Sequence, residues 1–222
     1  MKQDKCVLES VRIDAGIWKR VLHCEGETVL TITLRWPKLP EEHPSLRRIG
    51  RYYQHVADQW RSRWEVCLYA RACTELASLR ERCLPFHPWE AALDFSVTYN
   101  ARGLLSLYMD AYEFTGGAHG NTVRCGDVWD LACAMPRILP SFFPPGSRWR
   151  RESIAAVRTE IERQMATGDY MYLDGWYEAT ATEFDPCRFY LTDQGVTVFY
   201  PLYSLAPYVE GIPTFVVAPL PE

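Results

Sequence analysis

One short segment of the sequence, Ala111–Thr122 (AYEFTGGAHGNT), gathers the residues best suited to chemistry. His119 supplies its single imidazole, whose pKa near neutrality suits a general base or a metal ligand. Gly116, Gly117 and Gly120 allow the backbone to adopt positive φ or to come close to another group. The chemistry open to this segment is therefore acid–base catalysis by His119 or the binding of a ligand by a glycine-rich loop.

A catalytic role for His119 requires partners that the sequence does not identify. A general base needs a carboxylate to orient it and a nucleophile to act on, and the sequence does not place Glu113, Asp127 or Asp130 beside the imidazole. The simpler interpretation is that the imidazole hydrogen-bonds the backbone and holds the loop in shape. A phosphate-binding loop is disfavoured, because no Gly-Lys-Ser/Thr sequence and no helix follow the glycines.

Candidate binding residues come from this segment and from a second, aromatic one. In the first segment they are Tyr112, Thr115, Gly116, Gly117, His119 and Asn121. In the second, Tyr170–Tyr177 (YMYLDGWY), Tyr172 and Trp176 would stack on a glycan or a protein, since aromatic rings give a large contact area at low entropic cost. The competing interpretation buries these rings between a helix and a sheet, and their exposure would decide between the two.

Metal, nucleic-acid and membrane functions find no support in the sequence. The five histidines are scattered without His-x-x-x-His or Glu-x-x-His spacing, so we predict no metal and no cofactor. A net charge of −4, with 24 basic and 28 acidic residues mixed along the chain, argues against nucleic acid as a partner. No stretch resembles a membrane span or an apolar signal region, which predicts a cytoplasmic protein, or an extracellular one if a leader was removed.

The eight cysteines are spread along the chain without a Cys-x-x-Cys pair or a histidine at zinc-finger spacing. A chain of 222 residues that is 48% hydrophobic has enough apolar surface to build a core without disulfides. We therefore expect reduced, mostly buried thiols, with a disulfide or a redox thiol as the alternative.

The elements that would position the glycine-rich segment begin with three strands. Alternating apolar residues predict strands at Cys6–Ile13, Ile17–Cys24 and Val29–Trp36. Asp14–Gly16 and Glu25–Glu27 would supply the turns between them. The simplest arrangement is an antiparallel meander.

A long amphipathic helix should follow the meander. Ser45 has the position of an N-cap, and the proline-free stretch after it reaches about Leu84. Apolar residues recur there every three or four positions, which predicts one buried helical face. That face is predicted to contain Leu46, Ile49, Tyr53, Val56, Trp60, Trp64, Cys67, Ala70, Cys73, Leu76 or Ala77, and Cys83.

The second half of the chain reads as hairpins with one shorter helix. Pro85–Trp89 would end the long helix and separate two lobes, residues 1–84 and 85–222. The expected elements are strands at Ala92–Asn100, Leu104–Phe114 and Thr122–Leu131, a helix at Ser147–Thr167, a loop at Gly168–Trp176, a hairpin of Arg188–Thr192 and Val196–Tyr200, and a last strand at Pro213–Val217. The predicted fold class is α+β, with antiparallel sheets, one long amphipathic helix and a second shorter helix in two lobes.

Three segments in order resemble a known domain family. They are residues 112–121 with Asp130-Leu131 behind them, residues 189–196 and residues 203–211. They are similar to the domain of unknown function at the C-terminal end of RsiV-like anti-sigma factors, which also precedes the catalytic domain of the peptidoglycan deacetylase PdaC. The resemblance covers about residues 90–220, and residues 1–84 resemble, by their arrangement, the smaller module that usually stands before this domain.

The resemblance implies an α+β fold and a binding role, because the module in those proteins binds lysozyme or accompanies a separate enzyme. It transfers no catalytic residue. The sequence departs from the family at Ala132–Pro136, where a Thr-Gly-Lys turn is usual. We see no sigma-binding segment, membrane span or deacetylase domain and expect neither signalling nor deacetylation by this chain alone.

Taken together, the sequence predicts a non-enzymatic binding module of the bacterial RsiV-like type. By resemblance its partner would be lysozyme or a cell-wall fragment, that is, a protein or a glycan. A small hydrolase using His119 and a structural subunit of an oligomer are the two alternatives, and the oligomeric state is left open.

Overall fold

The computed structural model describes residues 8–168 and 170–220, which form two compact units. The N-terminal unit comprises residues 11–95 and 109–123. The C-terminal unit comprises residues 8–10, 96–108, 124–168 and 170–220. Each unit is described below by itself.

A six-stranded sheet has the strand order β1-β2-β3-β4-β5-β6. Its strands are β1 (Asp14–Cys24), β2 (Glu27–Lys38), β3 (Trp89–Ala101), β4 (Leu104–Phe114), β5 (Asn121–Asp130) and β6 (Met135–Pro136). β1 and β2 form an antiparallel hairpin, whereas β2 pairs with β3 in parallel, from Leu30 with Trp89 to Leu34 with Leu93. The sheet is therefore mixed, since a long helix carries the chain between β2 and β3.

The predicted three-stranded meander is wrong. Residues 8–13 of the expected strand Cys6–Ile13 form no strand, and Cys6 and Val7 lie outside the described residues. The turn expected at Asp14–Gly16 lies inside β1. A Cβ on Gly16 would lie 2.3 Å from Cε2 of Trp36, so this glycine makes room for a cross-strand indole rather than forming a turn.

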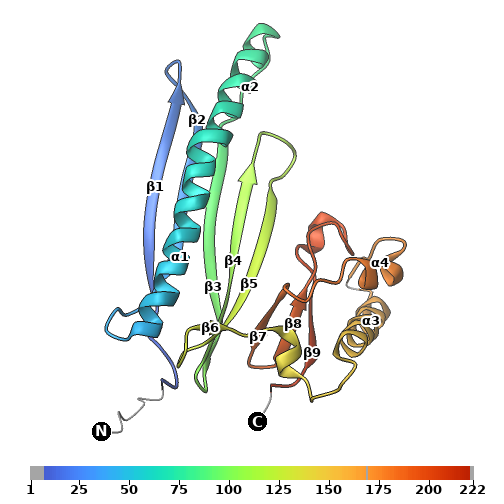
Figure 1. Ribbon diagram of the computed structural model, residues 1–222. Coiled ribbons are helices and arrows are strands. Elements are labelled where there is room, and N and C mark those ends of the chain that lie inside the picture. Colours follow the sequence, from blue (N-terminus) through green and yellow to red (C-terminus); the bar gives the residue numbers. More distant parts are fainter. Residues whose placement is uncertain (1–7, 169, 221–222) are drawn as a thin grey trace. The chain divides into compact units, whose positions relative to one another are not determined.

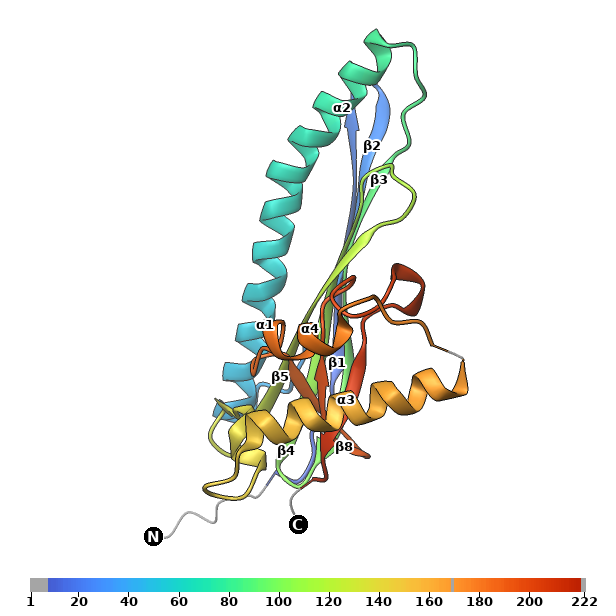
Figure 2. The same cartoon turned by 90° about the vertical axis from the view of Figure 1, so that its right-hand side faces the viewer.

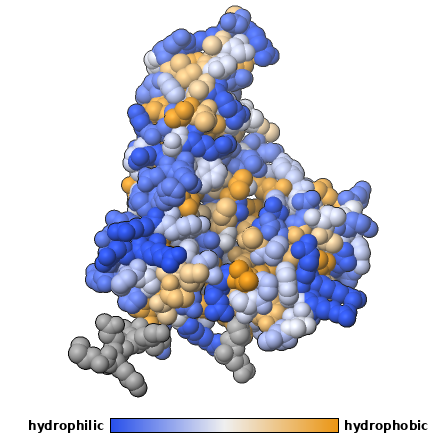
Figure 3. All heavy atoms as spheres, viewed as in Figure 1, coloured by the Kyte–Doolittle hydropathy of each residue, from blue (hydrophilic) through white to orange (hydrophobic). Residues whose placement is uncertain are grey.

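The long helix is present and covers one face of the sheet within the N-terminal unit (Figures 1 and 2). It consists of α1 (Pro44–Arg63), the π-helical segment η1 (Trp64–Leu68) and α2 (Tyr69–Glu81). Its N-cap is His43 rather than Ser45, because the His43 ring accepts a hydrogen bond from the Ser45 N–H at 3.3 Å. Pro44 fits the first helical position, where no N–H is needed. In Figure 3 the face that carries this helix shows hydrophobic patches among hydrophilic residues.

The π-helical segment changes which residues the second half of the helix buries. The Tyr69 N–H donates to the carbonyl of Trp64, five residues back, so this turn holds one residue more than an α-helical turn. The buried positions are Trp64, Leu68, Ala72 and Leu76. The expected burial of Cys67, Ala70, Cys73 and Cys83 is wrong: the π-helical turn moves Cys67 off the buried face, and Cys83 lies beyond the end of α2.

The expectation of mostly buried thiols is wrong. None of the seven described cysteines is buried, and none forms a disulfide among the described residues. The exposed ones are Cys67, Cys83, Cys125, Cys133 and Cys187. Cys24 and Cys73 are half-buried.

The hairpin that carries the glycine-rich segment forms as predicted. β3 and β4 are connected through Arg102 and Gly103, which have φ of 53° and 75°. Two consecutive positive φ values are typical of the tight turns that join antiparallel strands. β4 then ends at Phe114, and the segment leads from there into β5.

The C-terminal unit contains a three-stranded antiparallel sheet and two helices. Its strands are β7 (Phe189–Thr192), β8 (Gly195–Phe199) and β9 (Thr214–Ala218), and its helices are α3 (Trp149–Thr167) and α4 (Trp176–Thr182), with the 3-10 turns η2 (Leu139–Phe142) and η3 (Tyr208–Glu210). α3 packs against β9 and buries Val157 and Ile161. The predicted second helix, hairpin and last strand are confirmed, whereas α4, which has only seven residues, was not predicted.

The chain has an α+β fold, as predicted. Within residues 8–168 and 170–220, no helix combines the length and the apolar character needed to cross a membrane.

Candidate functional site

The glycine-rich segment forms the exposed connection between β4 and β5 in the N-terminal unit. Thr115 to His119 are all exposed. Gly116 has a φ of +80°, which other residues rarely adopt. Gly120 is buried against the ring of Tyr112, and a Cβ at this position would lie 2.2 Å from Cε2 of that ring. Two of the three glycines are thus required by the shape of the loop.

His119 contacts the backbone of its own loop. Its Nδ1 lies 3.2 Å from the carbonyl oxygen of Gly120, which fits an N–H donated to that carbonyl. Two of the three carboxylates considered as its partners bind other groups: Glu113 accepts from the Trp64 indole, and Oδ1 of Asp130 accepts from the N–H groups of Ala132 and Cys133 at 3.0 and 3.3 Å. This geometry supports the interpretation of His119 as a residue that shapes the loop.

The base of the loop is tied to the long helix by Glu113. Its Oε1 accepts a hydrogen bond from the indole N–H of Trp64 at 2.7 Å and lies 3.5 Å from Nε of Arg63. Trp64 is fully buried and is the first residue of the π-helical segment η1. A bond from a neutral donor to a carboxylate is stronger than one between neutral groups. The loop therefore has a rigid attachment, and π-helical turns often occur at functional sites.

An open groove of about 550 Å³ lies beside the loop. We call it the loop groove, and it is lined by Ala70, Arg71, Thr74, Glu75, Trp89 and Thr115. The Arg71 guanidinium lies 5.6 Å from the centre of the Trp89 ring. Among the described residues Arg71 forms no ion pair, so its charge faces the groove without a carboxylate partner. The groove thus offers one cation, one carboxylate and two hydroxyl groups to a ligand.

Sequence reasoning named Thr115 but missed the helical side of this groove. Arg71, Thr74 and Glu75 are spaced three and four residues apart, so they share one exposed face of α2. This spacing in the sequence indicates that the three side chains share a face. The position of that face beside Thr115, however, depends on packing between segments about 40 residues apart in the sequence.

The aromatic candidates Tyr172 and Trp176 belong to the C-terminal unit and so to a different site from the loop. Both are half-buried against the core of that unit. The Tyr172 hydroxyl donates a hydrogen bond to Oε1 of Gln164, and burial raises the pKa of Tyr172 to about 12. Tyr170 and Tyr177 are 47% and 48% exposed, so the segment divides into packed and exposed rings.

Two segments of the chain match known protein families. Residues 25–122 match the family described as deacetylase PdaC, and residues 141–218 match a protein family of unknown function, DUF3298. The two matches, in this order along the chain, fit an architecture of a PdaC-like segment followed by a DUF3298 segment. The resemblance predicted from sequence motifs is thereby confirmed, and the loop and the loop groove lie within the PdaC-type segment.

Two solved structures have the same fold. A DUF3298 family protein from Pseudomonas aeruginosa is 22% identical, covers 95% of this chain and 92% of its own, and has a TM-score of 0.60. A DUF3298 family member from Bacteroides fragilis is 16% identical, covers 95% and 91% of the two chains, and has a TM-score of 0.58. At these identities the similarity establishes the fold alone. No curated protein matches the chain.

Proposed function

We propose that the chain is a binding module without catalysis of its own, and that it binds a cell-wall glycan fragment through the glycine-rich loop and the loop groove. The observation that supports this most is the hydrogen bond from Trp64 to Glu113, which fixes the base of an otherwise exposed loop. A loop that is already held in shape loses less conformational entropy when it binds. Binding surfaces in proteins are commonly loops carried on a rigid frame.

The lining of the loop groove favours a hydroxyl-rich ligand. Thr74 and Thr115 provide hydroxyl groups, and Arg71 and Glu75 provide donors and acceptors for hydrogen bonds. Trp89 is only 5% exposed, so it contributes the wall of the groove rather than a stacking platform. A volume of about 550 Å³ lies in the range of small-ligand sites. Lysozyme, the other partner implied by the resemblance, would have to contact the loop itself.

Calorimetry with soluble peptidoglycan fragments and with lysozyme tests the proposal. We expect fragments to bind, and Arg71→Gln and Thr115→Ala to weaken binding by about five- to tenfold each, as expected for the loss of one hydrogen bond to a ligand. Arg51→Gln is the matched control, since Arg51 is exposed on α1 outside the groove. Absence of binding to both partners, or equal binding by the Arg71 variant, would refute the site.

The non-catalytic part of the proposal has its own test. Fragments incubated with the chain should keep their mass, as measured by mass spectrometry. Loss of acetyl groups or cleavage by the wild-type chain, abolished in His119→Ala, would instead establish the hydrolase alternative.

A further inference from the structure

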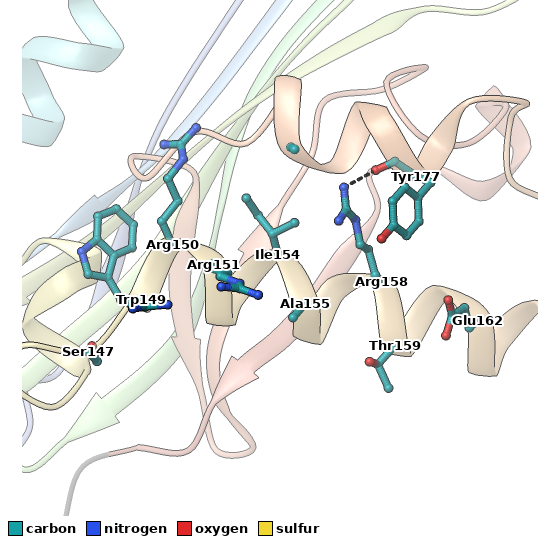
Figure 4. Close-up of a pocket in the computed structure, with 12 residues that line it drawn as sticks. Ser147, Trp149, Arg150, Arg151, Ile154, Ala155, Arg158, Thr159, Glu162 and Tyr177 are labelled. Atoms are coloured by element: carbon teal, nitrogen blue, oxygen red, sulfur yellow. Dashed lines mark hydrogen bonds between the residues drawn. The ribbon is translucent and has the colours of Figure 1, made fainter.

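A second groove, of about 810 Å³, lies between α3 and α4 in the C-terminal unit (Figure 4). We call it the arginine groove. Its basic residues are Arg148, Arg150, Arg151 and Arg158, and Glu162 is the one carboxylate of its lining. Ile154, Ala155 and Ala181 provide apolar surface, and Trp149 and Tyr177 stand on either side of it. The groove thus combines strong positive charge with a small apolar patch.

Two of these arginines are held in place by α4 and its neighbouring loop. Arg158 donates to the Tyr177 carbonyl at 2.7 Å and to the Thr180 hydroxyl at 2.9 Å, and its guanidinium lies 3.6 Å from the centre of the Tyr177 ring. Arg150 donates to the Phe184 carbonyl at 3.3 Å. Carbonyl and hydroxyl acceptors position a guanidinium but leave its full positive charge in the groove.

The other two arginines have no acidic partner. Among the described residues, the side chains of Arg148 and Arg151 form no ion pair and no hydrogen bond. Arg163, farther along the same helix, is different because it pairs with Glu160 at 2.7 Å. The unpaired arginines are therefore confined to the groove end of α3.

The position of these arginines is unfavourable for the helix itself. Arg148 is the N-cap of α3, and Arg150 and Arg151 lie in its first turn. The N-terminal end of a helix carries partial positive charge, which favours acidic rather than basic residues there. Glu152, in the first turn, accepts a hydrogen bond from the backbone N–H of Arg148 at 2.9 Å and offsets part of this repulsion. An anionic group bound in the groove would reduce the remainder, and that gain would add to its binding.

We propose that the arginine groove binds an acidic peptide segment that carries one apolar side chain. Carboxylates of the segment pair with Arg148 and Arg151, since guanidinium groups bind carboxylates through two parallel hydrogen bonds. The apolar side chain lies on Ile154 and Ala155. This site is separate from the loop groove, because the two grooves belong to different units.

A peptide fits this groove better than nucleic acid does. Arg158 covers one face of the Tyr177 ring, and Trp176 meets the same ring in a T-shaped contact with 5.6 Å between ring centres, so at most one face of Tyr177 is open to a base. Stacking of a base needs an uncovered aromatic face. The chain as a whole also has a net charge of −4, which opposes a polyanion more than it opposes a short acidic segment.

Fluorescence anisotropy with a labelled glutamate-rich peptide containing one leucine tests this proposal. We expect the peptide to bind with an affinity that falls as salt is added. Arg148→Gln and Arg151→Gln should each lower the affinity about tenfold, and the double variant about a hundredfold. A tenfold loss of affinity corresponds to about 1.4 kcal/mol. Ile154→Ser should weaken binding of the leucine peptide but not of an all-glutamate peptide. Arg163→Gln, on the same helix, is the matched control and should bind as wild type does.

Several results would overturn this inference. The first is that a peptide with glutamine in place of glutamate binds as tightly as the acidic peptide. The second is that the Arg148→Gln/Arg151→Gln variant binds the acidic peptide as tightly as wild type does. The third is that the peptide does not bind while inorganic phosphate or a single-stranded oligonucleotide does. Arg71→Gln, in the loop groove, should leave peptide binding unchanged. The failure of one groove to bind its proposed ligand can therefore be recognised independently of the other groove.

Discussion

The hydrogen bond between the Trp64 indole and Glu113 joins the long helix to the base of the glycine-rich loop, and Glu113→Ala would remove it. The donor is completely buried, and the N–O distance is 2.7 Å. A hydrogen bond to a charged group contributes about 1.5–3 kcal/mol, and a buried donor left without an acceptor costs about 1–3 kcal/mol. The Arg63 ion pair adds only about 0–1 kcal/mol, because Arg63 is 56% exposed. We expect Glu113→Ala to lower the free energy of unfolding by about 2–3 kcal/mol.

Two further variants separate the contributions to this value. Glu113→Gln keeps a neutral acceptor for the indole and should cost about 1 kcal/mol. In a Trp64→Phe background, where the N–H donor is gone, Glu113→Ala should cost only about 1 kcal/mol. The double-mutant cycle should therefore give a coupling energy of about 1–2 kcal/mol between the two side chains.

Urea denaturation followed by far-ultraviolet circular dichroism is the suitable assay, because the N-terminal unit contains the long helix. Glu90→Ala serves as the control, since Glu90 is exposed on β3 and should change stability by less than about 0.5 kcal/mol. Equal stability of the Glu113→Ala and Glu90→Ala variants would refute the anchoring role of Glu113. A coupling energy near zero would show that the indole N–H finds another acceptor.

Three other predictions concern the loop, a tyrosine and the thiols. Gly120→Ala should destabilise the loop and increase its cleavage in limited proteolysis, because the new Cβ would lie 2.2 Å from Cε2 of Tyr112. Burial raises the pKa of Tyr172 in the folded chain from 10.0 to about 12. The resulting contribution to stability is present below pH 10 and lost as the pH rises from 10 to 12. Tyr172→Phe should therefore flatten this part of a plot of unfolding free energy against pH. The hydrogen bond with Cys73 raises the pKa of the Cys24 thiol, so Cys24 should alkylate more slowly than the exposed cysteines in a mass-spectrometric time course.

Local patterns in the sequence were sufficient for much of the fold. Leu30, Ile32 and Leu34 alternate with polar residues, and they lie in β2 and are almost completely buried, as a strand with one covered face requires. The positive φ values at Arg102 and Gly103 fit the turn predicted between β3 and β4. These features depend on neighbours in the sequence, so they can be deduced without knowledge of the tertiary structure.

Features that depend on contacts between distant residues could not be deduced. The parallel pairing of Leu30 with Trp89 joins residues almost 60 positions apart, and nothing in either strand's pattern specifies that neighbour. The local pattern predicts a turn at Gly16, because Trp36, the residue that requires a glycine there, lies on another strand. The candidate site shows the same dependence on distant contacts. Thr115 is a binding candidate from the sequence, but Arg71, which lines the loop groove with it, is not.

The π-helical segment is the single local feature that links the fold to the candidate site. Trp64, Leu68, Ala72 and Leu76 are each four residues apart, and in an uninterrupted α-helix such a series would rotate away from the sheet by about 40° per step. A regular helix would instead continue the buried face through residues 67, 71 and 75, which would turn Arg71 and Glu75 toward the sheet.

The extra residue of this π-helical turn removes that rotation between Trp64 and Leu68. It keeps Leu68, Ala72 and Leu76 on the sheet and leaves Arg71 and Glu75 to line the loop groove. The same turn begins at Trp64, which binds Glu113 at the base of the loop. One irregular turn therefore accounts for the attachment of the loop, for the exposure of its groove and for the exposure of Cys67, which an uninterrupted helix would have buried.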